Sequence, residues 1–312
     1  MADLKVFRLG EDGQDVELRS STVALEVQLQ RRVEASMEAM LGIRFLASEY
    51  PTGPWHRGRV DSLGLDENGA PVVIEFKKGN DSGVVSQAVS YLTWLKSSRH
   101  EFEALVREKL GSEAAKSVDW RAPRALCIAA GFSHHDRVAV GDLGRQWPIE
   151  LVRYRIFDGG LLSLQLVEPV SAAVGQAAVR RSPTPSVPAA AAEAAAELPV
   201  AGDVPECLRD LYAELDEVLT ASGEVETVVL KHYIAYRRLQ NVASVIFRPS
   251  ASHRAILLYL RLDPDTVELE EGFTRDMRGI GHLGTGDLEV RIASAADLEK
   301  AAPLIERAIQ AA

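Results

Sequence analysis

The spacing of apolar residues predicts alternating helices and strands in the first part of the chain. Apolar side chains recur three and four positions apart over 22–41, which predicts a helix. Residues 59–65 and 70–77 resemble two strands instead, because an Asn-Gly pair between them supplies the chemistry of a tight hairpin turn. The other predicted elements of this part are an opening hairpin over 4–20, helices over 84–98, 101–116 and 134–144, and strands over 125–132, 149–157 and 161–169. Strands flanked by helices on this scale favour an α/β or α+β layer fold.

In the last part of the chain, apolar residues again show the spacing of helices and of strands, but the predicted elements follow one another in a different order. A helix is predicted near 205–219 and a second one over 295–310. The strands predicted between these helices cover 231–237, 243–249, 254–262 and 288–294. This order predicts a small α+β domain.

Residues 171–203 separate the two parts and differ from both in composition. They contain twelve Ala and four Pro among 33 positions and no aromatic residue. Such a stretch cannot bury enough apolar surface to offset the cost of ordering the chain. We therefore predict a linker here, between a first domain over 1–170 and a second domain over 204–312.

The composition excludes several classes of protein. With 46% hydrophobic and 26% charged residues the chain is typical of globular proteins, and no apolar run reaches the roughly 18 residues of a membrane-spanning helix. The beginning of the sequence lacks the apolar segment of a secretory signal. Two cysteines, Cys127 and Cys207, are too few for a disulfide framework or a four-cysteine zinc site, so we expect a cytoplasmic protein without membrane association.

The charge is unevenly distributed between the two parts. The formal net charge of −10 argues against non-specific coating of nucleic acid. Residues 1–170 contain 21 basic and 24 acidic residues, whereas residues 171–312 contain 14 and 21. The first part is therefore the better candidate for contact with an anionic partner.

Three charged side chains in the predicted hairpin carry the chemistry. Alternate residues of a strand share a face, so Glu75 and Lys77 point the same way while Phe76 points to the other side. Asp61 lies on the partner strand and can come near Glu75. Two carboxylates held that close repel each other and lose their water, a conflict that a divalent cation resolves.

These groups suit a metal-assisted hydrolysis. Mg²⁺ prefers one or two carboxylates together with waters and phosphate oxygens. A lysine beside the carboxylates can position or deprotonate the attacking water, which makes phosphodiester hydrolysis the expected reaction class. The competing interpretation of Glu75 and Lys77 is a surface ion pair.

A predicted helix and a basic loop flank these residues. Gln87, Tyr91 and Trp94 are spaced i, i+4 and i+7 and form one stripe, which suits a nucleic-acid groove. Packing in the core is an equally open interpretation of the two aromatic residues.

Basic residues stand on both sides of the motif. Arg57 and Arg59 precede Asp61, together with Trp55, and Lys78 follows the motif directly. We expect these basic side chains to contact phosphates, with a solvated loop as the alternative for the two arginines.

The stretch GRVDSLGLDENGAPVVIEFKKG, followed by SQAVSYLTWL, resembles the catalytic domain of NucS-type mismatch endonucleases within the PD-(D/E)xK nuclease superfamily. The family's G-R-[IV]-D pattern falls on 58–61, its E-[LFV]-K pattern on 75–77, and its helical Gln and Tyr on Gln87 and Tyr91. Glu26 is the best match to an acid that the family carries on its first core helix. The resemblance covers roughly 20–165. It implies a restriction-endonuclease-like core, in which helices flank a mixed sheet, followed by the small α+β domain.

The resemblance also implies an activity and a set of roles. It implies a Mg²⁺- or Mn²⁺-dependent endonuclease that cuts DNA and leaves a 5′-phosphate and a 3′-hydroxyl. Asp61, Glu75 and the carbonyl of Phe76 would hold the metal, and Lys77 would position the attacking water. Glu26 and Gln87 would then support the metal and the water.

The chain departs from the family in two respects. Val60 stands where the superfamily name has a proline, and no stretch matches the DNA-binding domain of the mismatch enzymes, which leaves mismatch specificity open. The second part resembles a small domain of unknown function that often accompanies such cores. That resemblance implies co-occurrence and no chemistry of its own.

Other motifs have simpler explanations. Residues 279–284 match GxGxxG, but a strand is predicted to follow where a dinucleotide site needs a helix, so we interpret them as a turn-rich loop. His134 and His135 stand at a predicted helix start and indicate a cap rather than a metal site. Tyr233 and Tyr236, with basic neighbours, form a candidate nucleic-acid face, and a protein-binding or dimerising role is equally open.

We therefore expect a metal-dependent DNA endonuclease that acts in repair or in defence against foreign DNA. The alternative is a non-catalytic nucleic-acid-binding or sensor module on a nuclease-like scaffold, whose second domain recruits a partner. The sequence does not separate DNA from RNA as the substrate. A homodimer is compatible with the sequence, because cutting both strands often needs two active sites.

Overall fold

The computed structural model of the chain describes residues 4–10, 13–22, 25–79, 83–143, 147–167, 204–250 and 253–311. The chain divides into two compact units, Met1–Arg181 and Ser182–Ala312. This division falls inside the stretch 171–203 that the composition predicts as a linker, and that stretch lies outside the described residues.

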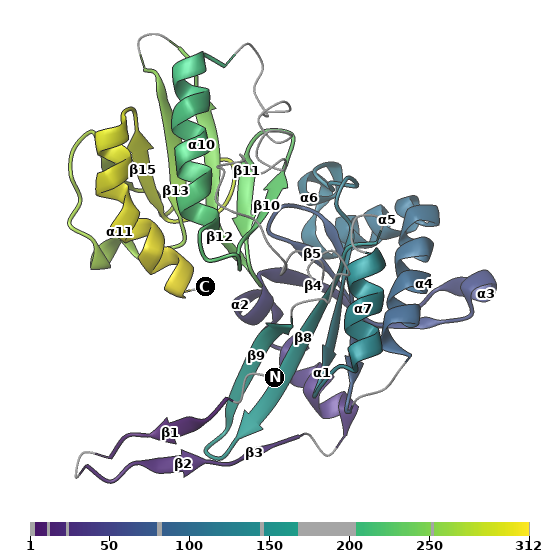
Figure 1. The fold of residues 1–312 in the computed structure, drawn as a ribbon. Coiled ribbons are helices and arrows are strands. Elements are labelled where there is room, and N and C mark those ends of the chain that lie inside the picture. Colours follow the sequence, from purple (N-terminus) through teal and green to yellow (C-terminus); the bar gives the residue numbers. More distant parts are fainter. Residues whose placement is uncertain are drawn as a thin grey trace, which may run out of the picture. The chain divides into compact units, whose positions relative to one another are not determined.

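A mixed β-sheet forms the centre of the first unit (Figure 1). Its strands are β3 (Ser20–Ser21), β4 (Ile43–Pro51), β5 (Arg59–Asp66), β6 (Pro71–Lys77), β7 (Arg124–Ala129), β8 (Ile149–Phe157) and β9 (Leu161–Val167). They lie in the order β3-β8-β7-β6-β5-β4, and β9 also pairs with β8. The β6–β7 and β7–β8 pairs are parallel, and the other pairs are antiparallel. The two central strands β6 and β7 are buried along almost their whole length, with α4 packed on both strands and α1 in contact with β6.

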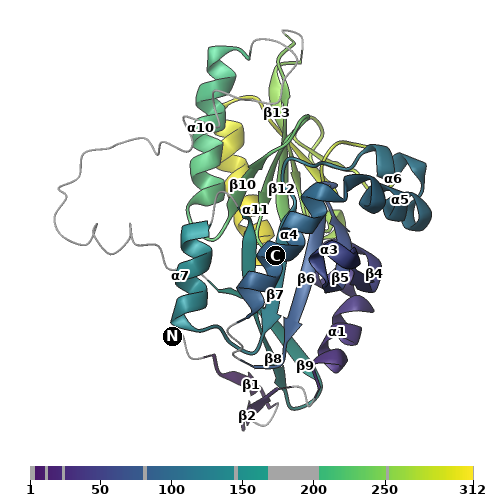
Figure 2. The ribbon, with the colours of Figure 1, turned by 90° about the vertical axis from the view of Figure 1, so that its right-hand side faces the viewer.

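Helices pack on both faces of this sheet, as Figure 2 shows from a second side. On one face α4 (Val84–Ser97) covers β6 and β7, and its apolar residues share a core with Leu63 and Val73. On the other face lies α2 (Met37–Leu41). Its Met37 lies so near Gly64 of β5 that a Cβ atom at that position would touch the Met37 sulfur. The other helices are α1 (Glu26–Glu34), α3 (Gly53–His56), α5 (Arg99–Leu110), α6 (Ser112–Lys116) and α7 (His134–Leu143). The predicted fold class, a restriction-endonuclease-like mixed sheet flanked by helices, is confirmed.

Most predicted elements of this unit are present, with differences that have local causes. The opening hairpin is confirmed as β1 (Val6–Arg8) paired with β2 (Val16–Leu18), and the Asn-Gly turn joins β5 to β6. The single helix predicted over 22–41 is wrong, because Ser36 has a non-helical backbone and separates α1 from α2. The helix predicted over 101–116 is interrupted at Gly111, whose φ of 92° favours glycine. Strand β4 was not predicted.

The second unit is a sheet with two long helices. Its elements are α10 (Glu206–Thr220), β10 (Glu226–Val229), β11 (Ile234–Arg237), β12 (Asn241–Arg248), β13 (Ala255–Leu260), the 3-10 helix η1 (Pro264–Thr266), β14 (Thr274–Asp276), β15 (Leu288–Ile292) and α11 (Ala295–Ala311). The strands lie in the order β10-β11-β12-β13-β15-β14, and every pair is antiparallel. Both helices contribute to one core with alternate residues of the strands. This arrangement confirms the predicted α+β class.

Membrane-spanning helices are absent from the described residues, since none of the helices there is both long and apolar enough to cross a bilayer.

Candidate active site

Strands β5 and β6 stop pairing just where their charged residues stand. The antiparallel ladder between them ends at the pair Ser62–Ile74. Beyond this pair the backbone N–H of Phe76 donates to Oδ2 of Asp61 at 2.8 Å. A carboxylate thus takes the place of a strand partner, and it is held at the edge of β6 beside Glu75. The sequence predicted this convergence from the hairpin and the period of two.

Glu75 is a buried carboxylate in which only one of the two oxygens has a hydrogen-bond partner among the described residues. Only 3% of the residue is exposed, because helices cover both faces of β6. Its Oε1 accepts a hydrogen bond from Nζ of Lys77 at 3.0 Å. Its Oε2 is buried and has no hydrogen-bond partner among the described residues. An unsatisfied buried carboxylate oxygen is costly, so a ligand that reached it would be stabilising.

Both acids are less acidic than ordinary carboxyl groups. Burial raises the pKa of Asp61 to about 6, although the N–H of Phe76 and the charge of Lys77 act against it. Burial, followed by the negative charge of Asp61, raises the pKa of Glu75 to about 7. The negative charge at this place is therefore poorly compensated by the protein itself, which favours the binding of a cation.

Lys77 lies between acids from two elements. Its Nζ is 3.0 Å from Oε1 of Glu75 and 3.8 Å from Oε1 of Glu26 on α1. Burial lowers the pKa of Lys77, but the hydrogen bond and charge of Glu75 outweigh it, so the pKa is raised overall. Lys77 is therefore a charged hydrogen-bond donor near neutral pH and not a base. Glu26 also accepts the backbone N–H of Lys78 at 2.8 Å, which ties α1 to the end of β6.

A second residue of α1, which the sequence analysis did not identify, holds the backbone of Asp61. Nε2 of the buried Gln30 donates to the carbonyl of Asp61 at 2.8 Å and to Oε1 of Glu34 at 3.1 Å. The same Oε1 accepts the hydroxyl of Ser62 at 2.6 Å. Gln30 follows Glu26 by four positions, so the helical spacing from that predicted acid was a signal that could have identified it.

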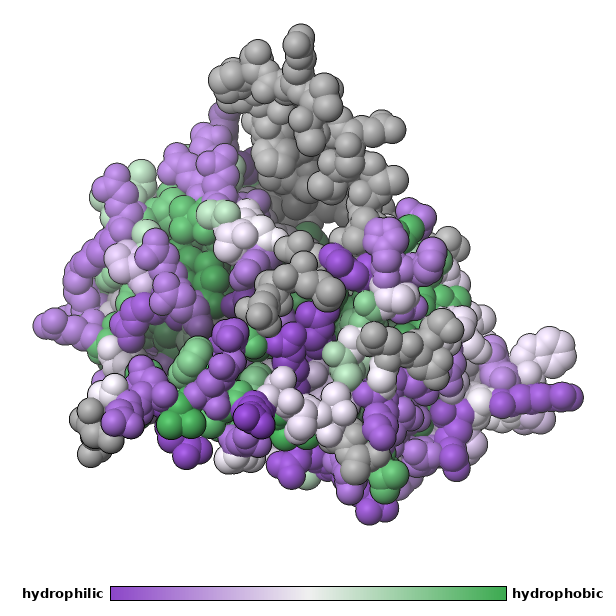
Figure 3. Space-filling model, turned by 60° about the horizontal axis from the view of Figure 1, so that its bottom comes forward, coloured by the Kyte–Doolittle hydropathy of each residue, from purple (hydrophilic) through white to green (hydrophobic). Residues whose placement is uncertain are grey.

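A braced loop connects β4 to β5 next to the acids. The N–H of Thr52 donates to the carbonyl of Gly58, and the N–H of Gly58 donates to Oγ1 of Thr52, both at 2.9 Å. Within this loop α3 carries Trp55, which is 90% exposed, and the exposed Arg57 follows the helix directly. At the right-hand edge of Figure 3, where α3 lies, hydrophilic and intermediate residues project from the surface.

Glu49 on β4 is another acid at this place that the sequence analysis missed. It has a φ of 53°, which is uncommon for a residue with a side chain, and it lies between the paired positions Ser48–Ser62 and Tyr50–Val60, opposite Asp61. Its carboxylate forms an ion pair of 2.5 Å with Arg59 and contributes to the raised pKa of Asp61. No sequence signal identified Glu49, because β4 itself was not predicted. Arg59 is thus exposed but already paired with an acid.

The predicted stripe on α4 is corrected by the structure. Trp94 is 1% exposed and packs on Tyr50, with ring centroids 5.6 Å apart. Tyr91 is also buried, and its hydroxyl donates to the carbonyl of Arg59 at 2.9 Å. Both aromatic residues therefore belong to the core, and no exposed aromatic face exists on this helix. Gln87 is half-buried and its side chain contacts Tyr91 through a hydrogen bond, so it lies at the margin of the acids.

The residues at the site suit a divalent cation held by two carboxylates. The described residues contain no group of three or more His, Cys, Asp or Glu side chains that could hold a metal ion. The unsatisfied Oε2 of Glu75 and the raised pKa of both acids fit a cation that takes its remaining ligands from water and substrate, as Mg²⁺ does.

Several motifs outside this site have structural roles. The hydroxyl of Ser133 accepts the N–H of Asp136 at 3.1 Å, and Asp136 in return accepts the N–H of Ser133 at 2.9 Å, so a capping arrangement explains the adjacent histidines. Cys127 is fully buried, as expected. The basic-aromatic face proposed for β11 is corrected, because Tyr236 points into the core and donates to Asp216 at 2.6 Å. Strand β15 follows the GxGxxG loop, which confirms that it is not a dinucleotide motif.

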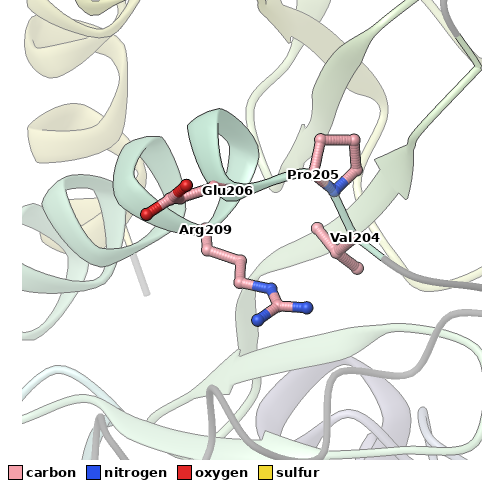
Figure 4. A pocket seen from close by; sticks show the side chains of 4 residues that line it. All are labelled: Val204, Pro205, Glu206 and Arg209. Atoms are coloured by element: carbon pink, nitrogen blue, oxygen red, sulfur yellow. The ribbon is translucent and has the colours of Figure 1, made fainter.

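A hollow at the beginning of α10 is shown in Figure 4. It is lined by Val204, Pro205, Glu206 and Arg209. Its described lining offers one acid and one base, three positions apart on α10, and no pair of carboxylates such as the one at β5 and β6.

Comparison with known proteins finds only low sequence identity. No family model matches the chain. An uncharacterized protein of Haemophilus influenzae is 24% identical over 322 residues, covering 98% of this chain and all of the relative. A repair endonuclease from Pyrococcus abyssi matches 48% of this chain and 50% of its own, with 18% identity and a TM-score of 0.29. EndoMS in complex with double-stranded DNA matches 48% of this chain and 65% of its own, with 17% identity and a TM-score of 0.26. The match thus spans about half to two thirds of those chains, and the fold class rests on the sheet topology described above.

Proposed function

We propose that this chain is a metal-dependent nuclease that hydrolyses phosphodiester bonds in DNA. The observation that carries the proposal is the convergence of Asp61, Glu75 and Lys77 where β5 and β6 separate, with one carboxylate oxygen buried and unsatisfied among the described residues. An ordinary surface ion pair does not account for this arrangement, because Glu75 is buried and a second acid lies beside it.

Asp61, Glu75 and the carbonyl of Phe76 would hold Mg²⁺ or Mn²⁺. N–H and C=O of one residue point to the same side of a strand, and the N–H of Phe76 already points at Asp61 beyond the end of the ladder. The metal would polarise a phosphoryl oxygen and lower the pKa of a water molecule.

Lys77 would orient the attacking water and stabilise negative charge on the phosphate. Its raised pKa keeps it charged, so Lys77 itself would not take the proton of the water. Glu26 and Glu75 hold the ammonium from two directions and thereby fix the direction of its free hydrogen. Gln30 would act as a positioning residue for Asp61, and Gln87 would support the water network from α4.

The braced loop and the exposed Lys78 would contact the DNA backbone. Arg57 and Lys78 are exposed beside the acids, and Arg59 would exchange Glu49 for a phosphate. Trp55 replaces the buried Tyr91 and Trp94 as the aromatic side chain available for stacking on a base. These residues do not distinguish DNA from RNA, and the choice of DNA rests on the family resemblance.

The direct test is cleavage by the purified chain. Plasmid, single-stranded and branched DNA, and RNA of matched sequence, are incubated with Mg²⁺, with Mn²⁺ or with chelator. We expect metal-dependent cleavage of DNA that disappears in Asp61→Asn and Glu75→Gln. Glu113→Gln, which changes an exposed acid on α6, is the matched control and should cut like the wild type.

Two other outcomes would decide against parts of the proposal. Cleavage at the wild-type rate by both variants would show that the acids are not the active site. Retardation of DNA without cleavage under any metal condition would support the binding module on a nuclease-like scaffold. Calorimetric titration with Mn²⁺ separates these cases, because only a nuclease site should lose metal binding in Glu75→Gln.

A further inference from the structure

The second unit has a sheet with two unlike faces. Helices α10 and α11 pack on the face made by residues such as Val245, Leu258 and Val290. Side chains alternate along the strands, so the residues between these, Ile246 and Tyr259 among them, lie on the other face. Among the described residues no helix covers that face, and both helices in Figure 1 lie on the first one.

A pocket of about 590 Å³ lies on this second face. Its floor is apolar, formed by the buried Ile246, Tyr259 and Met277. The volume is in the range of sites that hold small organic ligands, and an apolar floor with few polar groups is typical of them.

The GxGxxG loop, which the proposed nuclease function does not use, forms one wall of the pocket. His282 of this loop stacks on Tyr259, with ring centroids 4.5 Å apart and ring planes at 20°. Gly284 has a φ of 84°, and a Cβ there would lie 2.5 Å from Cβ of Ser244, so only glycine lets the loop approach β12 so closely. Ile280 and Leu283 stay exposed beside the pocket although they are large and apolar.

Two arginines at this pocket have no acidic partner. Residues 204–312 contain 18 acidic and 12 basic residues, so an arginine there is expected to find a carboxylate. Arg237 and Arg278 do so, with ion pairs of 2.6 and 2.7 Å. Arg248 and Arg275, which line the pocket, form no ion pair or hydrogen bond within the described part of the chain. Their guanidinium groups are thus available to an anion.

Glu289 also lines the pocket, but it forms no ion pair with Arg248 or Arg275 within the described residues, and its carboxylate accepts the hydroxyl of Tyr259. Burial, followed by this hydrogen bond, raises the pKa of Tyr259. Glu289 is the cross-strand neighbour of both Tyr259 and Arg275 in the sheet.

His282 offers a hydrogen-bond acceptor to the ligand. Its Nδ1 lies 3.0 Å from the carbonyl of Ile280. A carbonyl only accepts, so Nδ1 carries the hydrogen and Nε2 of the neutral ring has a lone pair. Nε2 is buried and has no partner among the described residues, which suits an N–H of a ligand.

We propose that this pocket binds a phosphorylated nucleoside. Arg248 and Arg275 would hold the phosphate. The base would lie on the apolar floor and donate an N–H to Nε2 of His282, with Ile280 and Leu283 at its edge. The inference is independent of the proposed nuclease activity, since it uses no residue of the first unit. The phosphorylated nucleoside has two sources, a free nucleotide or the terminal nucleotide of a nucleic-acid strand.

The test is binding to the full chain with chelator present, so that no strand is cut. The probes are AMP, GMP, UMP and inorganic phosphate, and short oligonucleotides with a 5′-phosphate or a 5′-hydroxyl, measured by calorimetry. We expect at least one nucleotide or 5′-phosphorylated strand to bind more tightly than inorganic phosphate. Arg248→Ala with Arg275→Ala should weaken this binding by about 10- to 100-fold, which corresponds to the loss of charge-assisted hydrogen bonds.

Two further variants sharpen the result. Arg307→Ala removes an exposed arginine on α11, at the helical face, and should bind like the wild type. His282→Phe keeps the ring stack but removes the acceptor, and should weaken nucleotides while leaving inorganic phosphate unchanged. Preference for mononucleotides would identify the free source, and preference for 5′-phosphorylated strands the strand end.

Three outcomes would overturn the proposal. The first is that no probe binds to the wild type. The second is that inorganic phosphate binds as tightly as every nucleotide. The third is that the double arginine variant binds nucleotides as the wild type does.

Discussion

Strand β5 carries two aspartates, one near each end, whose surroundings differ. At the turn end, Asp66 lies with Glu150 and one base, Arg124. Nη1 of Arg124 donates to both carboxylate oxygens of Glu150 at 3.1 and 3.0 Å, and Nε donates to Asp66 at 3.2 Å. The other oxygen of Asp66 accepts the backbone N–H groups of Asn68 and Ala70. Within the described residues this cluster is satisfied.

At the other end of the strand Asp61 and Glu75 lie near Lys77, with Glu26 and the ion pair of Glu49 with Arg59 close by. Asp61 and Glu75 share Lys77, but a lysine presents a compact point charge and reaches only one oxygen of Glu75. Oε2 of Glu75 remains without a partner among the described residues, and the pKa of both acids is raised. The forked arginine therefore satisfies both acids at the turn, whereas the lysine leaves one oxygen of Glu75 without a partner among the described residues.

The largest expected effect concerns the lysine. Lys77→Met should lower the cleavage rate by about 10²- to 10³-fold, the usual contribution of one donor that stabilises developing negative charge. Its measurement is single-turnover cleavage of labelled DNA at saturating Mg²⁺. Lys116→Met removes an exposed lysine that is paired with Glu113 and should leave the rate unchanged. Equal rates in both variants would contradict the role of Lys77.

The second prediction addresses the satisfied cluster. Arg124→Met should lower the free energy of unfolding by about 3 to 5 kcal/mol, because it leaves the buried Asp66 and its neighbour Glu150 without their cation. Urea unfolding measures this change. Arg121→Met, which breaks an exposed ion pair with Asp119, should cost less than about 1 kcal/mol. A cost for Arg124→Met no larger than for Arg121→Met would show that the two clusters do not differ in this way.

The third prediction is a pH dependence of the metal-free protein. The pKa of Glu75 is higher in the folded state than its ordinary value of 4.5, so between pH 4.5 and about 7 the folded state binds more protons than the unfolded state. The free energy of unfolding should therefore fall as the pH rises through this range. The full cost, up to about 3 kcal/mol, is present above pH 7.

Glu75→Gln removes this titration and should make the metal-free protein more stable than the wild type at pH 8, with little difference at pH 4. Thermal unfolding at both pH values measures the effect. Mg²⁺ should stabilise the wild type more at pH 8 than at pH 5, since protons compete with the cation for the acids. A variant that is less stable than the wild type at pH 8 would contradict the buried, uncompensated charge.

The smallest expected effect concerns the braced loop. Trp55→Ala should weaken binding of single-stranded DNA by about 1 to 3 kcal/mol, the contribution of one stacked base. Stability should hardly change because the side chain is 90% exposed. Fluorescence anisotropy in chelator measures the affinity, and Phe at this position should restore most of it. Unchanged affinity would remove Trp55 from the DNA contact and leave the acids untouched.

Local sequence patterns predicted that the acids of the site lie together, but they did not predict the neighbouring residues that hold these acids in place. A hairpin turn and a period of two suffice to bring Asp61 near Glu75, because both rules act over a few residues. Gln30 was missed because its hydrogen bond to Asp61 joins residues that are 31 positions apart in the sequence. Glu49 was missed because it lies on β4, a strand that the sequence did not predict. Trp94 was left open because a helix with two apolar stripes does not reveal which one the sheet covers.

The sequence by itself determined which side chains share a strand face, where the hairpin turns, and that two acids and an ammonium meet, because these follow from bond geometry and short spacing. Only the tertiary structure decided which of these charges are buried and which remain unsatisfied. Burial and compensation depend on the helices and strands that happen to cover a residue, and these come from distant parts of the chain. The chemistry of the site therefore resides in a difference of environment between two residues, Asp61 and Asp66, that the sequence presents as alike.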